Sequence, residues 1–213
     1  MKFIKIFFRF FSFIYTYKIH NKCQSLKNTI FTLWISNFLG HLGEHSRICY
    51  PCTLQGGGQK NISIGDNTVI NRTSILGCWT KYGKQSFPTA SITIGNHCSI
   101  GEYNHITACN KITIGDGLLT GRYVIISDNA HGGLSEEESL IEPAKRNLMS
   151  KGEVVIGNNV WLGDKVAVLS GTHIGNNVIV AANAVVTKDL PDGCIAAGVP
   201  AKVLRRIINE PSN

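Results

Sequence analysis

The chain has 213 residues, which is enough for one domain plus a short extension. Its composition, with 43% hydrophobic and 16% charged residues, excludes an intrinsically disordered chain. The formal net charge is +7 at pH 7, but residues 1–43 carry six of these charges and no acid, so nucleic-acid binding by the whole chain is not indicated.

The N-terminal segment, residues 1–43, is basic and strongly aromatic. Lysine and arginine interrupt it too often for a transmembrane helix, which needs roughly 20 predominantly apolar residues. No cleavage site made of small residues follows Tyr17, so a signal peptide is not indicated. Two compatible interpretations remain open. One is a basic amphipathic helical segment that contacts an anionic membrane surface or a partner, and the other is a cap on the first coil of the next domain.

Residues 44–198 are predicted to form an all-β solenoid, because apolar residues recur there at every sixth position. Such a period would scatter apolar residues around a helix, whereas short strands separated by tight bends keep them on one side. Three sides close one coil, and stacked coils bury the apolar residues as ladders. The clearest run consists of Ile156, Leu162, Val168, Ile174, Val180 and Val186.

Two stretches interrupt the six-residue period, namely residues 77–92 and residues 128–153. Loops of this length on a compact scaffold are usually functional or disordered. The longer loop is therefore a candidate for a functional segment.

The seven cysteines do not form a recognisable redox or metal motif. Cys49 and Cys52 have thioredoxin-like spacing, but no strand leads from them into a helix. A zinc site would need a second cysteine pair, which the sequence lacks. We therefore expect reduced thiols and a cytoplasmic protein.

Three short motifs follow one another in residues 154–207: Asn159-Val160-Trp161-Leu162-Gly163, Val186-Thr187-Lys188-Asp189 and Ala197-Gly198-Val199-Pro200-Ala201-Lys202-Val203. This stretch resembles the hexapeptide-repeat acyltransferases, most strongly the O-acetyltransferases that act on galactosides, maltose, lipopolysaccharide or other polysaccharides. The resemblance extends from about Ser63 to Ile207. It implies a left-handed parallel β-helix that assembles as a homotrimer and binds acetyl-CoA between adjacent subunits. It also implies a short C-terminal helix and tail over residues 199–213.

The resemblance further implies a catalytic histidine at the root of the long loop, and His131 stands at that position. A sugar hydroxyl attacks a thioester poorly unless its proton is removed during the attack. Histidine titrates near neutral pH, so it can take this proton and then pass it to the departing CoA thiolate. We therefore interpret His131 as the general base and expect no protein nucleophile.

The imidazole needs an orienting group, and the acceptor needs a hydrogen-bond partner. Similar enzymes often place an asparagine in the coil before the histidine. If the turn here is one residue shorter, Glu102 and Asn104 fall on those positions. We expect them to face the same cleft as His131, with Glu102 as the better candidate and Asp128 as a weaker one.

For coenzyme A, the resemblance implies contacts with the pantetheine arm and with the nucleotide phosphates. Trp161 matches a ring beside the pantetheine arm, and Lys202 and Arg205 match positions near the phosphates, where cationic side chains are suitable. The remaining implied contacts are Asp164, Ala182, Thr187 and Lys188.

The sequence therefore favours an acetyl-CoA-dependent O-acetyltransferase that acts on a sugar hydroxyl in lipopolysaccharide, capsule or exopolysaccharide biosynthesis. A membrane-facing N-terminus would suit lipid-linked acceptors and a peripheral position at the inner face of the membrane. No metal is expected, because His97, His105 and His173 lack the spacing of a three-histidine site. Two alternatives stay open: N-acetylation of an amino-sugar nucleotide, and a non-catalytic solenoid scaffold.

Overall fold

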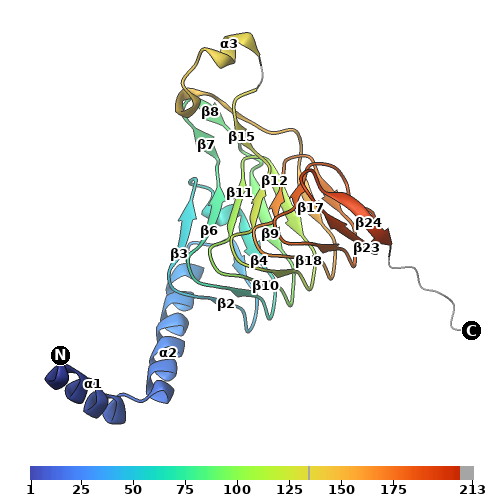
Figure 1. Ribbon diagram of the computed structural model, residues 1–213. Helices are drawn as coiled ribbons and strands as arrows, with labels where there is room; N and C mark the ends of the chain where they lie inside the picture. Colours follow the sequence, from blue (N-terminus) through green and yellow to red (C-terminus); the bar gives the residue numbers. More distant parts are fainter. Residues whose placement is uncertain (134, 207–213) are drawn as a thin grey trace, which may run out of the picture.

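The computed structural model describes residues 1–133 and 135–206. Its central part is a solenoid in which successive coils add strands to three sheets, here called sheets A, B and C (Figure 1). Sheet A consists of β1 (His41–Leu42), β4 (Ile62–Ile64), β9 (Ser91–Ile94), β12 (Lys111–Ile114), β17 (Val154–Ile156) and β20 (His173–Ile174). Sheet B consists of β2 (Arg47–Ile48), β5 (Val69–Ile70), β10 (Ser99–Ile100), β13 (Leu119–Thr120), β18 (Trp161–Leu162), β21 (Ile179–Val180), β23 (Cys194–Ala197) and β24 (Lys202–Arg206). Sheet C consists of β3 (Cys52–Gln55), β6 (Ser74–Cys78), β11 (His105–Ala108), β14 (Ile125–Ser127), β19 (Ala167–Val168) and β22 (Val185–Val186).

Aliphatic ladders fill the interior of the solenoid, which confirms the predicted β-helix. In sheet A, five residues lie in register on neighbouring parallel strands, and all are buried: Ile64, Ile94, Ile114, Ile156 and Ile174. Burying an aliphatic side chain of this size contributes roughly 1.5–3 kcal/mol to stability. The six-residue period thus delivers one apolar side chain to each side of a coil. The first strand begins at His41, inside the segment predicted to precede the solenoid.

A column of amide and carboxylate side chains connects the coils at the bend from sheet A to sheet B. Each side-chain oxygen accepts a hydrogen bond from the backbone N–H of the corresponding residue in the preceding coil, at 2.7–2.8 Å. The column contains Asp66, Asn96, Asp116, Asn158 and Asn176. The residue after each of them has a positive φ, between 53° and 71°, which asparagine and glycine tolerate better than other residues.

The C-terminal part of helix α2 (Tyr17–Ser36) packs on the open N-terminal end of the solenoid, where its Ile35 is buried in the core. The Thr32 hydroxyl accepts a hydrogen bond from the backbone N–H of Ile48 at 3.1 Å. The side-chain oxygen of Asn28 accepts a hydrogen bond from the backbone N–H of Tyr50, also at 3.1 Å. These contacts pair backbone groups of the first coil that no earlier strand can reach. The second half of the N-terminal segment is therefore a cap.

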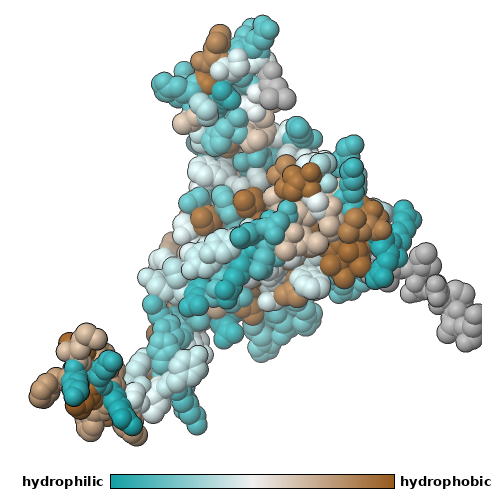
Figure 2. Space-filling view, in the orientation of Figure 1, coloured by the Kyte–Doolittle hydropathy of each residue, from teal (hydrophilic) through white to brown (hydrophobic). Residues whose placement is uncertain are grey.

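Helix α1 (Lys2–Ile14) extends away from the solenoid beyond the far end of α2, and none of its residues is buried (Figure 1). The spacing of Lys2, Lys5 and Arg9 places these cations on one face, while phenylalanine and isoleucine cover the rest of the helix. Figure 2 shows hydrophobic side chains gathered on this helix next to hydrophilic ones. In residues 1–133 and 135–206, no helix is long and apolar enough to cross a membrane.

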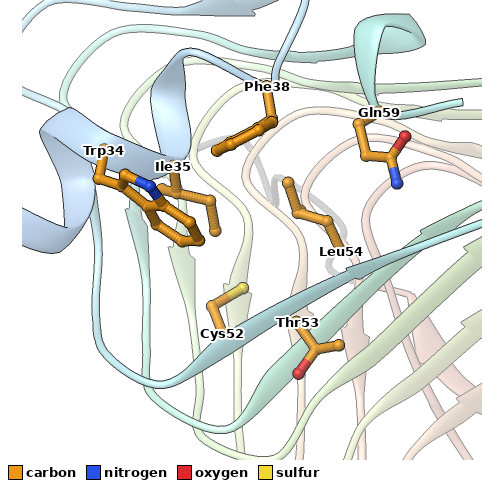
Figure 3. Close-up of a pocket in the computed structure, with 7 residues that line it drawn as sticks. All are labelled: Trp34, Ile35, Phe38, Cys52, Thr53, Leu54 and Gln59. Atoms are coloured by element: carbon orange, nitrogen blue, oxygen red, sulfur yellow. The ribbon is translucent and has the colours of Figure 1, made fainter. Parts of the chain in front are cut away.

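A small apolar pocket of about 320 Å³ remains between the end of α2 and the first coil (Figure 3). Trp34 and Phe38 face Leu54 and Cys52 across this pocket. Burial raises the pKa of the Cys52 thiol to about 12 and also raises that of Cys49. Both thiols therefore stay protonated at neutral pH, unlike a reactive cysteine pair. All seven cysteines are free.

Two excursions leave sheet C, after β6 and after β14, where the period breaks. The first carries the hairpin of β7 (Lys81–Tyr82) and β8 (Gln85–Ser86). The second carries β15 (Ala130–His131), α3 (Glu136–Ser139), a 3-10 turn (Pro143–Lys145) and β16 (Leu148–Met149). A second 3-10 turn (Gln59–Asn61) joins β3 to β4. The two excursions contact each other on one side of the solenoid (Figure 1).

The C-terminal segment corrects the prediction of a helix over residues 199–213. Its described part forms β24, which pairs antiparallel with β23, and residues 207–213 lie outside the described part. A strand forms because β23 would otherwise present a row of unpaired backbone groups. The segment also covers β22: the N–H of Val185 donates to Gly198 at 3.0 Å, and the N–H of Ala201 donates to Val185 at 2.8 Å.

Candidate active site

His131 lies where the two excursions rise from sheet C. It belongs to β15, where it is paired with Leu148 of β16. A cavity of about 260 Å³ adjoins it. The lining residues are Gln55, Trp79, Tyr82, His105, Thr107, Ile125, Ser127, Asn129, Ala130, His131 and Leu148. The predicted base therefore borders a pocket whose wall combines polar and aromatic side chains.

Tyr82 is the side chain that contacts the imidazole of His131. Its hydroxyl oxygen lies 3.4 Å from Nδ1 of His131, and the two rings meet edge to face with centroids 5.4 Å apart. The same hydroxyl donates a hydrogen bond to the carbonyl oxygen of Ala144 at 3.0 Å. Tyr82 thereby connects the hairpin of the first excursion to two segments of the second, namely β15 at His131 and the 3-10 turn at Ala144.

A second histidine, His105, lines the same pocket from β11. Burial lowers the pKa of His105 below its usual value of 6.5, so this side chain is neutral at pH 7. A neutral imidazole can donate and accept one hydrogen bond each, which suits contact with a hydroxyl group.

Asp128 anchors the start of the long excursion and does not contact His131. Its fully buried carboxylate accepts hydrogen bonds from the backbone N–H groups of Cys109 and Asn110 at 2.8 and 2.9 Å. Burial and the Asp128 carboxylate raise the pKa of Cys78 and Cys109 to about 11. Because the thiolate is the nucleophilic form, neither thiol supplies a nucleophile at neutral pH.

Within one chain, Glu102 and Asn104 do not line the His131 pocket. Glu102 lies at the bend from sheet B to sheet C, where it forms ion pairs with Arg72 at 2.7 Å and Arg122 at 3.4 Å. Asn104 points into the solenoid, accepts from the N–H of Val124 at 2.7 Å and donates to the Thr120 hydroxyl. The six-residue period explains both positions. The side chain of residue 104 points into the solenoid, and that of residue 102 lies on the outside of the bend.

Three of the residues predicted to bind coenzyme A line one groove on sheet B. Trp161, Asp164 and Ala182 border a cavity of about 460 Å³, and the Trp161 side chain is exposed. Gly163 keeps this surface close to the next coil, because a Cβ atom there would lie 2.6 Å from the backbone nitrogen of Ala182. Asp164 has a structural contact as well, since it accepts from the N–H of Arg122 at 2.8 Å.

The other four predicted donor contacts lie at the C-terminal end of the solenoid. Lys202 and Arg205 are exposed on β24, which belongs to the same sheet as Trp161. Thr187 and Lys188 are exposed directly after β22, at the end of sheet C.

The His131 pocket and the Trp161 groove share no residue. The His131 pocket adjoins the C-terminal ends of strands in sheet C. The Trp161 groove lies on sheet B and on the bend from sheet B to sheet C. One chain alone therefore holds the predicted base and the predicted donor groove on separate sides of the solenoid.

A family model described as "Bacterial transferase hexapeptide (six repeats)" matches residues 153–188. A relative from Escherichia coli (strain K12), provisionally named a lipopolysaccharide biosynthesis O-acetyl transferase, WbbJ, is 35% identical over 167 residues. This match covers 76% of the chain and 80% of the relative. The chain belongs to the hexapeptide-repeat transferases. It is an acyltransferase, and the predicted family and enzyme class are confirmed.

Further proteins resemble this hexapeptide-repeat transferase. The galactoside O-acetyltransferase of Escherichia coli (strain K12) is 38% identical over 101 residues, which cover 45% of the chain and 44% of that enzyme. A hexapeptide-repeat acetyltransferase from Vibrio cholerae, solved with acetyl-CoA, matches with a TM-score of 0.56 and 24% identity, covering 91% of both chains. The N-acyltransferase AntD from Bacillus cereus, solved with dTDP and 3-hydroxybutyryl-CoA, matches with a TM-score of 0.64 and 20% identity, covering 82% of this chain and 86% of AntD. The two solved structures support the fold alone.

The sequence did not identify Tyr82, Trp79 or Gln55 as pocket residues of this hexapeptide-repeat transferase. Trp79 follows β6 directly, and Tyr82 belongs to the hairpin of the first excursion. The six-residue period is absent there, so nothing in the sequence relates these residues to His131. The only available signal was the length of that excursion. Within the residues that the structure describes, no group of three or more histidine, cysteine, aspartate or glutamate side chains could hold a metal ion.

Proposed function

We propose that this transferase moves the acetyl group of acetyl-CoA to a sugar hydroxyl, with His131 as the general base. The observation that carries the proposal is the position of His131 in a pocket, with its Nδ1 next to Tyr82. The names of the two Escherichia coli relatives support O-acetylation.

The reaction needs few groups. The acceptor oxygen forms a bond to the thioester carbonyl carbon while its proton passes to the imidazole of His131. The carbon–sulfur bond then breaks, and the imidazolium returns the proton to the CoA thiolate. The protonated state of Cys78 and Cys109 favours this direct transfer over an acyl-enzyme.

The complete site is proposed to form between subunits of a left-handed homotrimer. The separation of the His131 pocket from the Trp161 groove supports this arrangement, because a neighbouring copy can supply the groove that one chain holds too far away. In it, Trp161 contacts the pantetheine arm, and Lys202 and Arg205 contact the phosphates. The donor site is completed by Asp164, Ala182, Thr187 and Lys188. Glu102 takes part in the reaction only if a neighbouring copy brings it to His131.

The acceptor is proposed to be a glycan of lipopolysaccharide, capsule or exopolysaccharide biosynthesis, attached to lipid at the inner face of the membrane. Helix α1 supports this location, since it presents apolar side chains and a cationic face with no part of the solenoid covering them. Helices of this kind lie in the interface of anionic membranes. The protein would then be a peripheral cytoplasmic enzyme.

The test is CoA release from acetyl-CoA with a panel of sugar and glycan acceptors. His131→Ala is expected to lose at least 100-fold in turnover, the size typical for removing a general base, while CoA binding remains. His41→Ala serves as the control, because it removes an exposed imidazole on β1 that lines neither cavity, and it is expected to keep wild-type turnover. Equal turnover of wild type and His131→Ala would contradict the proposal.

The acceptor panel also separates the two alternatives. Turnover restricted to amino-sugar nucleotides would replace the proposal with N-acetylation, for which the fold of AntD is a precedent. Failure of the wild type to bind CoA would favour a non-catalytic scaffold.

A further inference from the structure

The contact between Tyr82 and His131 bears on which ring nitrogen of the histidine is free. A neutral imidazole carries one proton, and only the nitrogen without it can act as a base. Nδ1 of His131 lies next to the Tyr82 hydroxyl, so this hydroxyl decides whether Nδ1 accepts or donates a hydrogen bond.

The position of Ala144 determines the direction of that hydrogen bond. A phenolic hydroxyl has a single hydrogen, and a carbonyl oxygen can only accept. The Ala144 carbonyl oxygen is 3.0 Å from the Tyr82 oxygen, which is closer than Nδ1 of His131 at 3.4 Å. The hydrogen of Tyr82 therefore goes to Ala144, and the lone pairs of its oxygen face Nδ1–H. Hydrogen bonds at catalytic groups are often long before substrate binds and shorten in the complex.

We infer that Tyr82 is a positioning residue that keeps the proton of His131 on Nδ1 and leaves Nε2 free to act as the base. This inference rests on the proposed role of His131. The chain of hydrogen bonds runs from Nδ1–H through the Tyr82 oxygen to the Ala144 carbonyl. It also offers the imidazolium a hydrogen-bond acceptor after the proton transfer, as an orienting group must.

The surroundings hold Tyr82 in place for this task. Its ring meets Trp79 edge to face, with centroids 5.9 Å apart and an interplanar angle of 81°. The indole N–H of Trp79 is in turn 3.2 Å from the hydroxyl oxygen of Thr107 on β11, and donates to it. The tyrosine is thus fixed to the solenoid, not only to the excursion, so His131 is oriented relative to the rigid part of the molecule.

The first measurement compares wild type, Tyr82→Phe and Tyr50→Phe in steady-state kinetics. Tyr82→Phe keeps the ring and its packing but removes the hydroxyl. It is expected to lower kcat by about 10- to 100-fold, the loss seen when histidines that bind metals are deprived of their outer hydrogen-bond partner, with the KM for acetyl-CoA unchanged. Tyr50→Phe removes a phenolic hydroxyl near the cap and is expected to match wild type. Wild-type kcat in Tyr82→Phe would overturn the inference.

The second measurement reads the tautomer directly. The ¹⁵N chemical shifts of the His131 ring, assigned by their absence in His131→Ala, are recorded at pH about 8.5, well above the ordinary pKa of histidine. Wild type is expected to carry its proton on Nδ1, and Tyr82→Phe to show a mixture of tautomers. A proton on Nε2 in wild type, or identical spectra in both proteins, would overturn the inference. Because these spectra do not depend on turnover, the tautomer can be read even if His131 proves not to be the base.

Discussion

The side-chain amide of Gln85 forms two hydrogen bonds with the backbone of Leu148, which lies 63 residues later in the chain. The amide nitrogen donates to the carbonyl oxygen at 3.1 Å, and the amide oxygen accepts from the N–H at 2.7 Å. Gln85 is the partner of Tyr82 in one hairpin, and Leu148 is the partner of His131 in the other. The two pairs therefore fix both excursions relative to each other.

Replacing Gln85 should loosen this connection. Gln85→Ala removes two hydrogen bonds that contribute about 1 kcal/mol each, so the long excursion should open more often. We expect a severalfold lower kcat, an unchanged KM for acetyl-CoA and faster proteolysis between residues 135 and 147. Gln24→Ala on the exposed face of α2 is the control. A Gln85→Ala protein with wild-type kcat and wild-type proteolysis would show that the connection does not matter.

A site shared between subunits predicts complementation. His131→Ala lacks the base, and Ala182→Trp fills the donor groove, so each protein alone should be inactive. When the two are co-expressed, some interfaces pair an intact groove with an intact His131, and part of the wild-type CoA-release rate should return. Co-expression of His131→Ala with His131→Asn is the control and should remain inactive. No recovery in the first mixture would place base and donor groove in the same subunit.

The cationic face of α1 predicts binding to anionic vesicles. Each lysine or arginine near such a surface contributes about 1 kcal/mol, so replacing Lys2, Lys5 and Arg9 with glutamine should weaken binding roughly 100-fold. Co-sedimentation with vesicles of phosphatidylglycerol and phosphatidylcholine measures this, and added salt should weaken the wild-type binding.

The control for this experiment keeps the net charge change but moves it elsewhere. Replacement of Lys81, Lys84 and Lys165 with glutamine removes three exposed cations away from α1. This protein should bind vesicles like the wild type. Equal loss in both triple variants would indicate a general charge effect and contradict a specific contact through α1.

The column of side chains at the bend from sheet A to sheet B predicts a stability difference. The Asp116 carboxylate accepts from the backbone N–H of Asn96 at 2.7 Å, so Asp116→Ala leaves this group without its partner. We expect a loss of about 1–3 kcal/mol in the free energy of unfolding, measured by urea denaturation. Asp116→Asn keeps an acceptor and matches Asn96 and Asn158 in the same column, so it should stay within about 0.5 kcal/mol of wild type.

The solenoid was predictable because each apolar position in the period corresponds to one rung of a ladder. Ile94 and Ile114, for example, are identifiable as neighbours without knowing any other contact. The structure of the C-terminal end of the solenoid was not predictable, because the composition of Lys202–Arg206 fits a helix and a strand equally well. Only the unpaired backbone of β23 decides between them, and this is a property of the folded chain.

The site was predicted only in part, for a related reason. His131, Trp161, Asp164 and Ala182 were assigned through the resemblance, and each of them lines a cavity of the structure. Asn104 was assigned to the cleft because its distance along the chain fitted, but a shift of one or two residues at a bend turns a side chain from outside to inside. Tyr82 is 49 residues away from His131 and lies in a stretch without period, so only the fold relates them.

Both ends of the solenoid are closed, by α2 at one end and by the segment that ends in β24 at the other. An open coil is a template on which a second copy could continue the stack, and repeated addition would give a fibre. Here the last strand also carries Lys202, Arg205 and Arg206, whose charges repel an approaching copy. A second copy could continue the stack only after displacing α2 or β24, so the two terminal segments protect the solenoid from end-to-end growth.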